Sequence, residues 1–163
     1  MKPRILILIS HFLPGTKIGG PLASNLNIIQ NLRSFFDFSI ITSSNDNGEK
    51  VKYDNIEICK WTVYQNIKIF YLPSGIAKII ELVKQINKTE ADIIYINSFF
   101  DIQFSILISV LAKFNFFGKK KIIIAPRGEF VEGCLNFKPR RKLIYLKFAK
   151  IFNIYNREIS IKT

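Results

Sequence analysis

Two adjacent glycines, Gly19 and Gly20, follow an apolar run at residues 4–10 and precede a segment with helical spacing. Glycine has no Cβ, so another molecule can approach its backbone closely. The start of a helix adds unpaired N–H groups and the positive end of the helix dipole. This combination predicts a phosphate-facing loop at Gly19 and Gly20. The alternative interpretation is a glycine turn that only joins a strand to a helix.

A second group of candidate residues, Arg127, Gly128 and Glu129, follows another apolar run at residues 121–125. An arginine guanidinium can hold a phosphate or sugar hydroxyls with its fork of N–H donors. A glutamate carboxylate can accept hydrogen bonds from hydroxyls or act as a base. Arg127 and Glu129 are therefore candidate site residues. The alternative is a surface ion pair between them, with a turn glycine in the middle.

Histidine and cysteine are scarce, which limits the chemistry. His11 is the only histidine, so a His-rich metal site is excluded, as is any Ser-His-Asp triad that does not use His11. Cys59 and Cys134 lie far apart and form neither a CxxC motif nor a disulfide framework. We predict no metal and no cofactor. His11 and Glu129 are the candidates for a catalytic base, and the choice between them stays open.

The elements that must position these residues alternate between two kinds of pattern. Strands are expected at residues 4–10, 36–42, 56–61, 67–72, 91–96 and 121–125, and helices at 21–32, 74–86, 102–114 and 139–150. Such alternation favours a parallel sheet with right-handed crossovers. We predict a single α/β domain over residues 1–163, with a Rossmann-like parallel sheet and helices on both faces.

Three of the helices carry more detailed expectations. Pro21 suits the first helical position, and Ser74 is a plausible N-cap for the helix that follows it. Small serines in the 102–114 segment suit a deeply covered helix. The residues expected to be buried at helical spacing are Leu22, Leu26 and Ile29 in the first helix and Ile76, Ile79, Ile80, Val83 and Ile86 in the second.

In parallel α/β sheets, ligands bind at the carboxyl ends of the strands. That rule selects four segments, 11–20, 43–46, 97–100 and 126–129, as one rim. Asn97 and Ser98 directly follow the expected strand at 91–96 and become candidate site residues. We therefore expect them to lie near His11, Arg127 and Glu129.

Positive charge is concentrated in the last third of the chain. The net charge is +12, and residues 113–163 carry 13 Lys and Arg against three Glu, whereas residues 1–112 carry 11 bases and 9 acids. The helix expected at 139–150 holds several of these bases beside aromatic and aliphatic residues: Arg140, Arg141, Lys142, Lys147 and Lys150. Such a helix could lie on an anionic membrane surface. The alternative is a helix packed on the sheet with a solvated basic edge.

No targeting or membrane-spanning segment is expected. Lys2 and Arg4 precede an apolar run that is too short for a signal peptide and has no cleavage site after it. Residues 102–117 are interrupted by Gln103 and Lys113 and fall short of the ~20 residues that span a bilayer. We expect a cytoplasmic protein, with a peripheral position on the inner face of the plasma membrane as the alternative.

The two motifs together resemble a known family. The segment His11-Phe-Leu-Pro-Gly-Thr-Lys-Ile-Gly-Gly-Pro21 and the segment Ile124-Ala-Pro-Arg-Gly-Glu-Phe130, followed by Gly133 and the basic segment 138–147, are similar to the N-terminal domain of family 4 glycosyltransferases of the GT-B type. The resemblance covers nearly the whole chain. Because the order and separation of the motifs match at expected strand ends, the combination is more specific than either motif alone.

This resemblance implies transfer of a sugar from a nucleotide-sugar donor to a growing glycan or lipid-linked acceptor, usually in bacterial surface polysaccharide assembly. It implies that Gly19 and Gly20 face the donor diphosphate. It places Arg127 and Glu129 at the rim of the cleft, and Asn97 and Ser98 near the acceptor. In that family the N-terminal domain holds most of the acceptor site.

The family also has a second Rossmann-like domain that binds the nucleotide sugar, whereas this sequence stops at Thr163, where a last strand would be forming. Because stabilising a diphosphate in a two-domain cleft takes charges from both walls, we expect an acceptor-side domain that is inactive by itself.

Two other function classes are alternatives. A dinucleotide-dependent oxidoreductase or epimerase needs G-x-G-x-x-G after the first strand, which residues 19–24 do not supply. The second class is a non-enzymatic basic module that binds an anionic membrane surface or a phosphorylated ligand. No nucleic-acid partner is expected, because no helix-turn-helix, RNP or zinc signature accompanies the charge.

Overall fold

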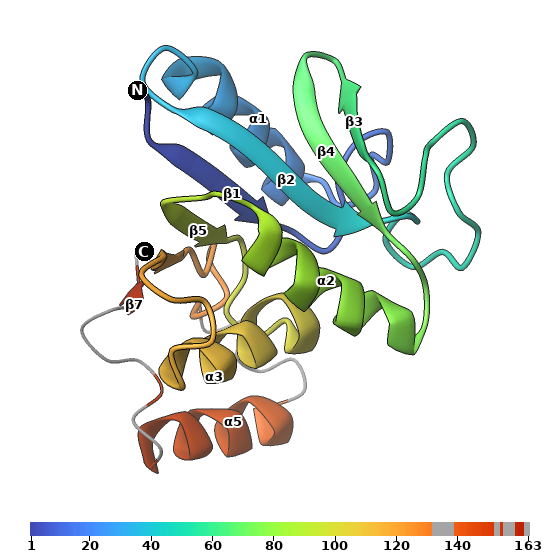
Figure 1. Ribbon diagram of the computed structural model, residues 1–163. Helices are drawn as coiled ribbons and strands as arrows, with labels where there is room; N and C mark the ends of the chain where they lie inside the picture. Colours follow the sequence, from blue (N-terminus) through green and yellow to red (C-terminus); the bar gives the residue numbers. More distant parts are fainter. Residues whose placement is uncertain (132–138, 152–153, 155–158, 162–163) are drawn as a thin grey trace.

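The computed structural model describes residues 1–131, 139–151, 154 and 159–161 (Figure 1). Two residues singled out from the sequence, Gly133 and Cys134, lie outside this range. In chain order the elements are β1 (Arg4–Leu8), α1 (Gly20–Leu32), β2 (Asp37–Ser43), β3 (Trp61–Tyr64), β4 (Ile67–Leu72), α2 (Ile76–Lys88), β5 (Ile93–Ile96), the π-helical turn η1 (Ile102–Ile106), α3 (Leu107–Lys113), β6 (Lys121–Ile124), α5 (Pro139–Ile151) and β7 (Ile159–Ile161).

The strands form one sheet with the order β3-β4-β2-β1-β5-β6-β7. All neighbouring pairs are parallel except β3 with β4, which is antiparallel and lies at the edge. The chain leaves β1 toward β2 on one side and later returns to pair β5 on the other. This reversal of strand order is the topological switch point of a doubly wound sheet. The predicted Rossmann-like α/β fold is confirmed.

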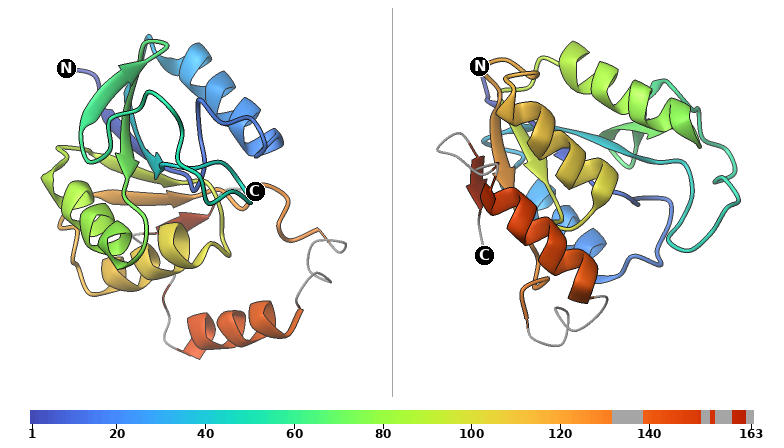
Figure 2. Two further views of the ribbon diagram at one scale, coloured as in Figure 1. Left: turned by 90° about the vertical axis from the view of Figure 1, so that its right-hand side faces the viewer. Right: turned by 90° about the horizontal axis from the view of Figure 1, so that it is seen from below.

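Helices cover both faces of the sheet, as predicted (Figures 1 and 2). Side chains along β1 alternate between two cores: Leu6 and Leu8 join the cluster beneath α2, α3 and α5, while Ile7 and Ile9 join the cluster beneath α1. Successive side chains of a strand point to opposite faces. A strand covered on both faces therefore needs a continuous apolar run, which is what β1 has.

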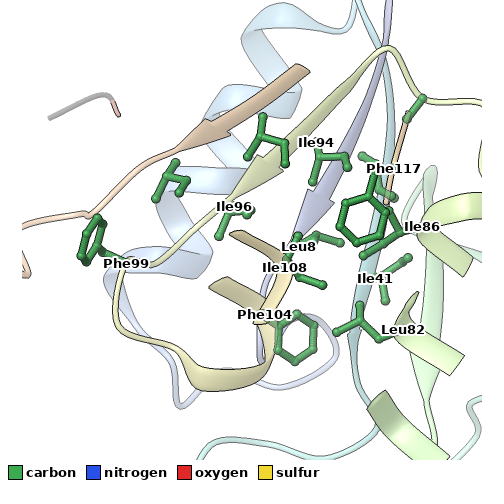
Figure 3. Close-up of a cluster of buried hydrophobic side chains, with 14 of the residues drawn as sticks. Leu8, Ile41, Leu82, Ile86, Ile94, Ile96, Phe99, Phe104, Ile108 and Phe117 are labelled. Atoms are coloured by element: carbon green, nitrogen blue, oxygen red, sulfur yellow. The ribbon is translucent and has the colours of Figure 1, made fainter. Parts of the chain in front are cut away.

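The larger core lies on the face covered by α2 and α3 (Figure 3). There Ile94 and Ile96 of β5 and Leu8 of β1 pack against Ile86 of α2 and Ile108 of α3, all fully buried. This packing fixes the central strands whose carboxyl ends carry the candidate site.

The prediction of a strand at residues 56–61 is wrong. Only an isolated bridge between Ile58 and Tyr71 forms there, and the strand occupies Trp61–Tyr64 instead. Cys59 has a φ of 61°, which interrupts an extended backbone. Gln65 and Asn66, at φ 48° and 64°, then form the two-residue connection between β3 and β4. Positive φ at both residues is the geometry that a tight hairpin requires.

Helix α2 forms where predicted but starts and packs differently. Its N-cap is Gly75 rather than Ser74, and no side chain caps it. Ile76 and Ile80 are 82% and 63% exposed, against the prediction that both are buried. Burial is confined to the second half of the helix, where Leu82 and Ile86 reach the core. Of the five residues predicted to be buried only Ile86 is, while Ile79 and Val83 are half-buried and Leu82 and Gln85 are buried instead, so the buried face is turned from the predicted one.

The remaining helices agree with expectation in outline. The predicted 102–114 helix is divided into η1 and α3, and Ser105 and Ser109 within it are fully buried. In α1, Leu22 and Ile29 are buried as predicted, whereas Leu26 is only half-buried. Among the helices in the described part of the chain, none has both the length and the apolar character needed to cross a membrane.

The central strand β5 gives a direct test of the core. Replacing Ile94 with Ala should lower the free energy of unfolding by about 2–5 kcal/mol, because a fully buried side chain is lost and a cavity is left behind. Urea unfolding monitored by circular dichroism measures this. Val63→Ala is the control: Val63 is 72% exposed on the edge strand β3, so its loss should cost well under 1 kcal/mol. Equal losses for the two variants would contradict this assignment of the core.

Candidate functional site

A cleft of about 280 Å³ lies at the carboxyl edge of the sheet. Its lining comes from the segments after β1, β2, β5 and β6 and from the start of α1: Ile9, Ser10, His11, Ile18, Pro21, Asn47, Asn97, Ser98, Asp101, Pro126, Arg127 and Glu129. Five residues predicted from the sequence therefore meet in one place. Larger hollows of about 380, 520 and 660 Å³ are lined by residues near the starts of the strands and contain none of the predicted site residues.

Arg127 bridges three segments at the rim of this cleft. Its Nε donates to Asn97 Oδ1 at 2.9 Å, one terminal nitrogen donates to Ser24 Oγ of α1 at 2.5 Å, and the other donates to the Tyr95 hydroxyl of β5 at 2.6 Å. A guanidinium has five N–H donors, so two remain for a ligand. The residue is exposed and its φ is 51°, a left-handed conformation that costs about 1–2 kcal/mol for a side-chain-bearing residue.

Tyr95 contacts the Arg127 guanidinium through both its hydroxyl and its ring. Burial raises the pKa of the Tyr95 hydroxyl, and the charge and hydrogen bond of Arg127 offset part of that rise. The centre of the guanidinium also lies 5.8 Å from the centroid of the Tyr95 ring. The phenol therefore stays protonated at neutral pH and accepts a hydrogen bond from Arg127, which fixes the orientation of the guanidinium.

Glu129 joins the loop after β6 to the loop after β5. Ser98 Oγ donates to Glu129 Oε1 at 2.8 Å, and the backbone N–H of Phe99 donates to Oε2. The backbone N–H of Asp101 in turn donates to Ser98 Oγ at 3.2 Å. Both carboxylate oxygens of Glu129 therefore already accept hydrogen bonds from the protein. This arrangement suits a residue that positions the rim and can still accept from a ligand hydroxyl.

His11 has a defined tautomer when its ring is neutral. Its Nδ1 lies 2.7 Å from the backbone oxygen of Asn45, and a carbonyl oxygen can only accept a hydrogen bond. Nδ1 therefore carries the proton, and Nε2 is left as the acceptor. Of the two candidate bases, His11 has the geometry in which a ring nitrogen can take a proton from a ligand.

Several buried polar atoms near the carboxyl ends of the strands have no hydrogen-bond partner within the described residues. Asn97 is only 6% exposed, lines the cleft, and leaves its Nδ2 donors unpaired. At the end of β2, the buried hydroxyls of Thr42, Ser43 and Ser44 also lack a hydrogen-bond partner among the described residues. A buried donor without a partner costs about 1–3 kcal/mol. The Asn97 amide is thus a buried donor in the wall of the cleft, and no described residue accepts from it.

Gly19 and Gly20 do not line the cleft, but they lie between Ile18 and Pro21, which do. Gly19 is the N-cap of α1 with a φ of 64°, and both glycines are exposed. A Cβ placed on either glycine would meet no atom within 4 Å. The backbone at the start of α1 is therefore open to another molecule, as the predicted phosphate-facing role requires.

The loop between β1 and α1 is held by Asp46, which is 6% exposed. Asp46 Oδ2 accepts from the backbone N–H groups of Thr16 at 3.0 Å and Lys17 at 3.3 Å, and Oδ1 accepts from Asn47 at 2.7 Å. Burial by itself raises the pKa of this carboxyl, but the three backbone donors outweigh burial and lower it. The Asp46 carboxylate thus fixes the backbone at Thr16 and Lys17, the residues that lead to Gly19.

Tyrosine hydroxyls hold the same loop from the other side. Tyr53 donates to the Phe12 carbonyl at 3.1 Å, and Tyr71 donates to the Leu13 carbonyl at 2.9 Å. Burial raises the pKa of Tyr71 to about 12, so this donor persists across the working pH range. Gly15 lies close beneath: a Cβ there would come within 2.2 Å of the Tyr53 hydroxyl oxygen, which explains why a glycine occupies the position.

Several residues of the site were not predicted from the sequence. Asp101 caps η1 by accepting from Gln103 and Phe104 at 2.9 and 2.7 Å, and it also accepts from Ser10 Oγ in the cleft. An aspartate between a strand end and a helical segment is a recognisable capping pattern. Ser24 and Tyr95 were also missed, because their partner Arg127 is distant in sequence and leaves no local signal. Asp46 belongs to the predicted rim segment 43–46, but its contacts with Thr16 and Lys17 could not be predicted.

The basic helix α5 lies alongside α3 on the outer face of the molecule (Figure 2). Arg140, Lys147 and Lys150 are exposed, whereas Lys142 is half-buried with its Nζ 4.9 Å from the Phe100 ring centroid. The side chain of Arg141 lies outside the described residues. Tyr145 and Ala149 are buried and attach the helix to the core.

Comparisons with known proteins identify no family for this chain. No protein-family model matches the sequence, and the search of curated proteins found no significant match. Among solved structures, homoserine dehydrogenase of S. aureus at pH 6.0 aligns with 17% identity and a TM-score of 0.41. The alignment covers 99% of this chain and 33% of the dehydrogenase chain, so this chain spans about a third of that protein's length. At this level the likeness carries no argument about function.

The Asp46 contacts predict a pH-dependent stability. Asp46→Asn should lower the free energy of unfolding at pH 7 by about 1–3 kcal/mol, because a buried carboxylate that holds three N–H groups is lost. The pKa of Asp46 is lower in the folded protein than its ordinary value of 3.8. The carboxylate therefore stabilises the fold above that value, and this contribution disappears as pH falls through the folded-state pKa.

Urea unfolding of both proteins at several pH values between 7 and 3 measures this effect. The difference between wild type and Asp46→Asn should shrink at the acidic end. Asp54→Asn, which removes the same charge from an exposed position, should change stability little at any pH. A constant difference across the range would show that the Asp46 charge does not stabilise the loop.

Proposed function

We propose that this chain binds a sugar acceptor in the carboxyl-edge cleft and takes part in sugar transfer from a nucleotide-sugar donor to a glycan or lipid-linked acceptor. One observation carries the proposal: the lining of the cleft includes the donors Arg127 and Asn97 and the acceptors Glu129 and Asp101, beside the open backbone of α1. Vicinal sugar hydroxyls each donate and accept hydrogen bonds. They match such a mixed lining better than a purely anionic or apolar ligand does.

The size of the cleft supports a small polar ligand. A volume of about 280 Å³ lies at the lower end of the range for ligand sites and suits a single sugar ring rather than a dinucleotide. The lining combines apolar side chains, Ile9, Ile18 and two prolines, with polar ones, and the polar groups would orient the ligand through hydrogen bonds. The resemblance of the two motifs to the acceptor-side domain of family 4 glycosyltransferases points to the same class of ligand.

The donor diphosphate belongs at Gly19 and Gly20 in this proposal. The exposed start of α1 offers the backbone N–H of Gly20 and the positive end of the helix dipole, without a Cβ in the way. Arg127 bonds to Ser24 in α1, so its two spare N–H donors lie on the same side of the molecule. A diphosphate can therefore be met by both a helix terminus and a guanidinium.

His11 is the residue that we assign to proton transfer. In the proposed step an acceptor hydroxyl gives its proton to His11 Nε2 while its oxygen forms a bond to the anomeric carbon of the donor. The bond between that carbon and the diphosphate oxygen breaks, and the nucleoside diphosphate leaves with the electron pair. Glu129, held by Ser98 and Phe99, orients the acceptor.

In this proposal, sugar transfer also requires a second set of charged groups on the opposite side of the bound diphosphate. The described cleft holds charges from one side only, whereas a diphosphate leaving group needs charges placed around it in a site that excludes water. We therefore infer that the chain binds ligands by itself and that turnover requires a partner domain carrying the nucleotide site.

Arg127 provides the test of ligand binding. Arg127→Gln should raise the Kd for UDP-glucose or GDP-mannose, whichever binds the wild-type chain, by about 10- to 100-fold, because a charged hydrogen bond contributes about 1.5–3 kcal/mol. Titration calorimetry and saturation-transfer NMR measure the affinity and the sugar protons in contact. Arg33→Gln is the matched control, since Arg33 is exposed just after α1 and lies away from the cleft.

Two outcomes would contradict the proposal. One is unchanged affinity in Arg127→Gln together with contacts at the other edge of the sheet. The other is tight binding of NAD⁺ with no binding of sugar nucleotides, which would favour the dinucleotide class instead. Binding of a methyl glycoside that is lost in Asn97→Ala but retained in Arg33→Gln would support an acceptor site in the cleft.

A second candidate function is a non-enzymatic module for an anionic membrane surface. Helix α5 presents bases and apolar side chains together on its exposed side: Arg140, Leu143, Ile144, Lys147, Phe148 and Lys150. No acidic residue occurs in the helix. Binding to vesicles that is lost in Lys147→Gln/Lys150→Gln would place this function on α5.

A further inference from the structure

The connection between α3 and β6 is a second surface with an unusual composition, and none of the functions above uses it. This segment, residues 113–121, has two strongly exposed aromatic side chains: Phe114 is 77% exposed and Phe116 is 52% exposed. It also contains four lysines: Lys113, Lys119, Lys120 and Lys121. We refer to residues 113–121 as the 113–121 turn. It lies at the amino edge of the sheet, where β6 begins, and so opposite the candidate cleft.

The exposure of the two phenylalanines is built into the backbone. The N–H groups of Phe114 and Phe116 both donate to the Leu111 carbonyl oxygen at 3.1 Å. The Gly118 N–H donates to the backbone carbonyl oxygen of Asn115 at 3.2 Å. Asn115 and Gly118 have φ values of 58° and 63°, which close the turn tightly. Phe117, between them, is 3% exposed and packs in the larger core. The turn is therefore anchored while its neighbouring rings face solvent.

The positive charge of the turn is not neutralised within the described residues. No acidic residue occurs between positions 102 and 128. None of the four lysines forms an ion pair with any described side chain. A hollow of about 660 Å³ beside the turn includes Asp92, but Asp92 accepts from the backbone N–H of Arg4 at 2.7 Å and lies 3.8 Å from the Arg4 side chain.

We propose that the 113–121 turn is a docking surface for an anionic lipid bilayer. Phe114 and Phe116 enter the boundary between headgroups and acyl chains, and the lysines contact lipid phosphates. Exposed aromatic side chains fixed beside clustered bases are the features that give interfacial binding. Single-stranded nucleic acid is less well matched, because it is usually held in a basic groove lined by stacking rings, whereas these rings lie on a short turn. The proposal does not depend on sugar transfer.

Flotation of the full chain with vesicles provides the first test. Wild type should bind phosphatidylcholine vesicles that contain phosphatidylglycerol, bind pure phosphatidylcholine vesicles weakly, and lose binding as salt rises. Lys119→Gln/Lys120→Gln should weaken binding roughly 30-fold, since each lysine near an anionic surface contributes about a fivefold factor. Phe114→Ala/Phe116→Ala should weaken it about tenfold.

Two matched controls remove the same chemistry elsewhere. Lys50→Gln/Lys52→Gln removes two exposed charges from the loop after β2, and Ile76→Ala/Ile80→Ala removes two exposed apolar side chains from α2. Both should bind vesicles like wild type, apart from the small general effect of lower net charge. If the controls and the turn variants lose affinity equally, binding is nonspecific and the proposal is overturned.

Fluorescence gives a test that does not rely on loss of binding. In Phe114→Trp, anionic vesicles should shift the tryptophan emission to shorter wavelength, because the indole enters an apolar layer. Val51→Trp, at a residue 76% exposed on the loop after β2, should show no such shift. Vesicle binding that needs Lys147 and Lys150 but leaves the position 114 emission unchanged would place the contact on α5 and overturn the proposal. Binding of RNA but not of vesicles would overturn it as well.

Discussion

The parallel pairing of β1, β5 and β6 is the constraint on which the candidate site depends. Leu8 pairs with Ile96, and Ile96 pairs with Ile124, so the three strands end at the same level. Whatever follows each strand must then emerge at one edge. Asn97 and Arg127, thirty residues apart in sequence, come within hydrogen-bonding distance for this reason. From this position the Arg127 guanidinium also reaches Ser24 of α1 and Tyr95 of β5.

Much of this edge could be predicted from the sequence because parallel strands with both faces covered have a plain signature. The apolar runs of β1 and β6 mark buried strands, and the polar residues directly after them mark the strand ends. That reasoning brought His11, Asn97, Ser98, Arg127 and Glu129 together, and the structure confirms that they line one cleft. It required only the fold class and the position of each strand end.

The parts that could not be predicted depend on long-range contacts. Asp46 and Tyr71 hold the loop after β1 through its backbone, and a backbone N–H group has no residue type from which its partner could be inferred. Ile76 and Ile80 have the correct helical spacing for burial, but spacing says nothing about where the sheet stops covering a helix. Prediction failed before β3 for a related reason: Cys59 has a positive φ that interrupts the expected strand, and a cysteine gives no sign of such a conformation.

Strand β6 joins the two ends of the molecule. The 113–121 turn leads into its first residue, and Arg127 follows shortly after its last one. The strand covers four residues, Lys121–Ile124, a rise of about 10 Å, and Arg127 lies three residues beyond its end. If the turn rests on a bilayer, this strand acts as a spacer that holds the cleft well above the lipid phosphates. An acceptor anchored in the same membrane would then have to extend its reacting hydroxyl across a comparable distance. Strand length would thereby discriminate between short and long membrane-bound glycans.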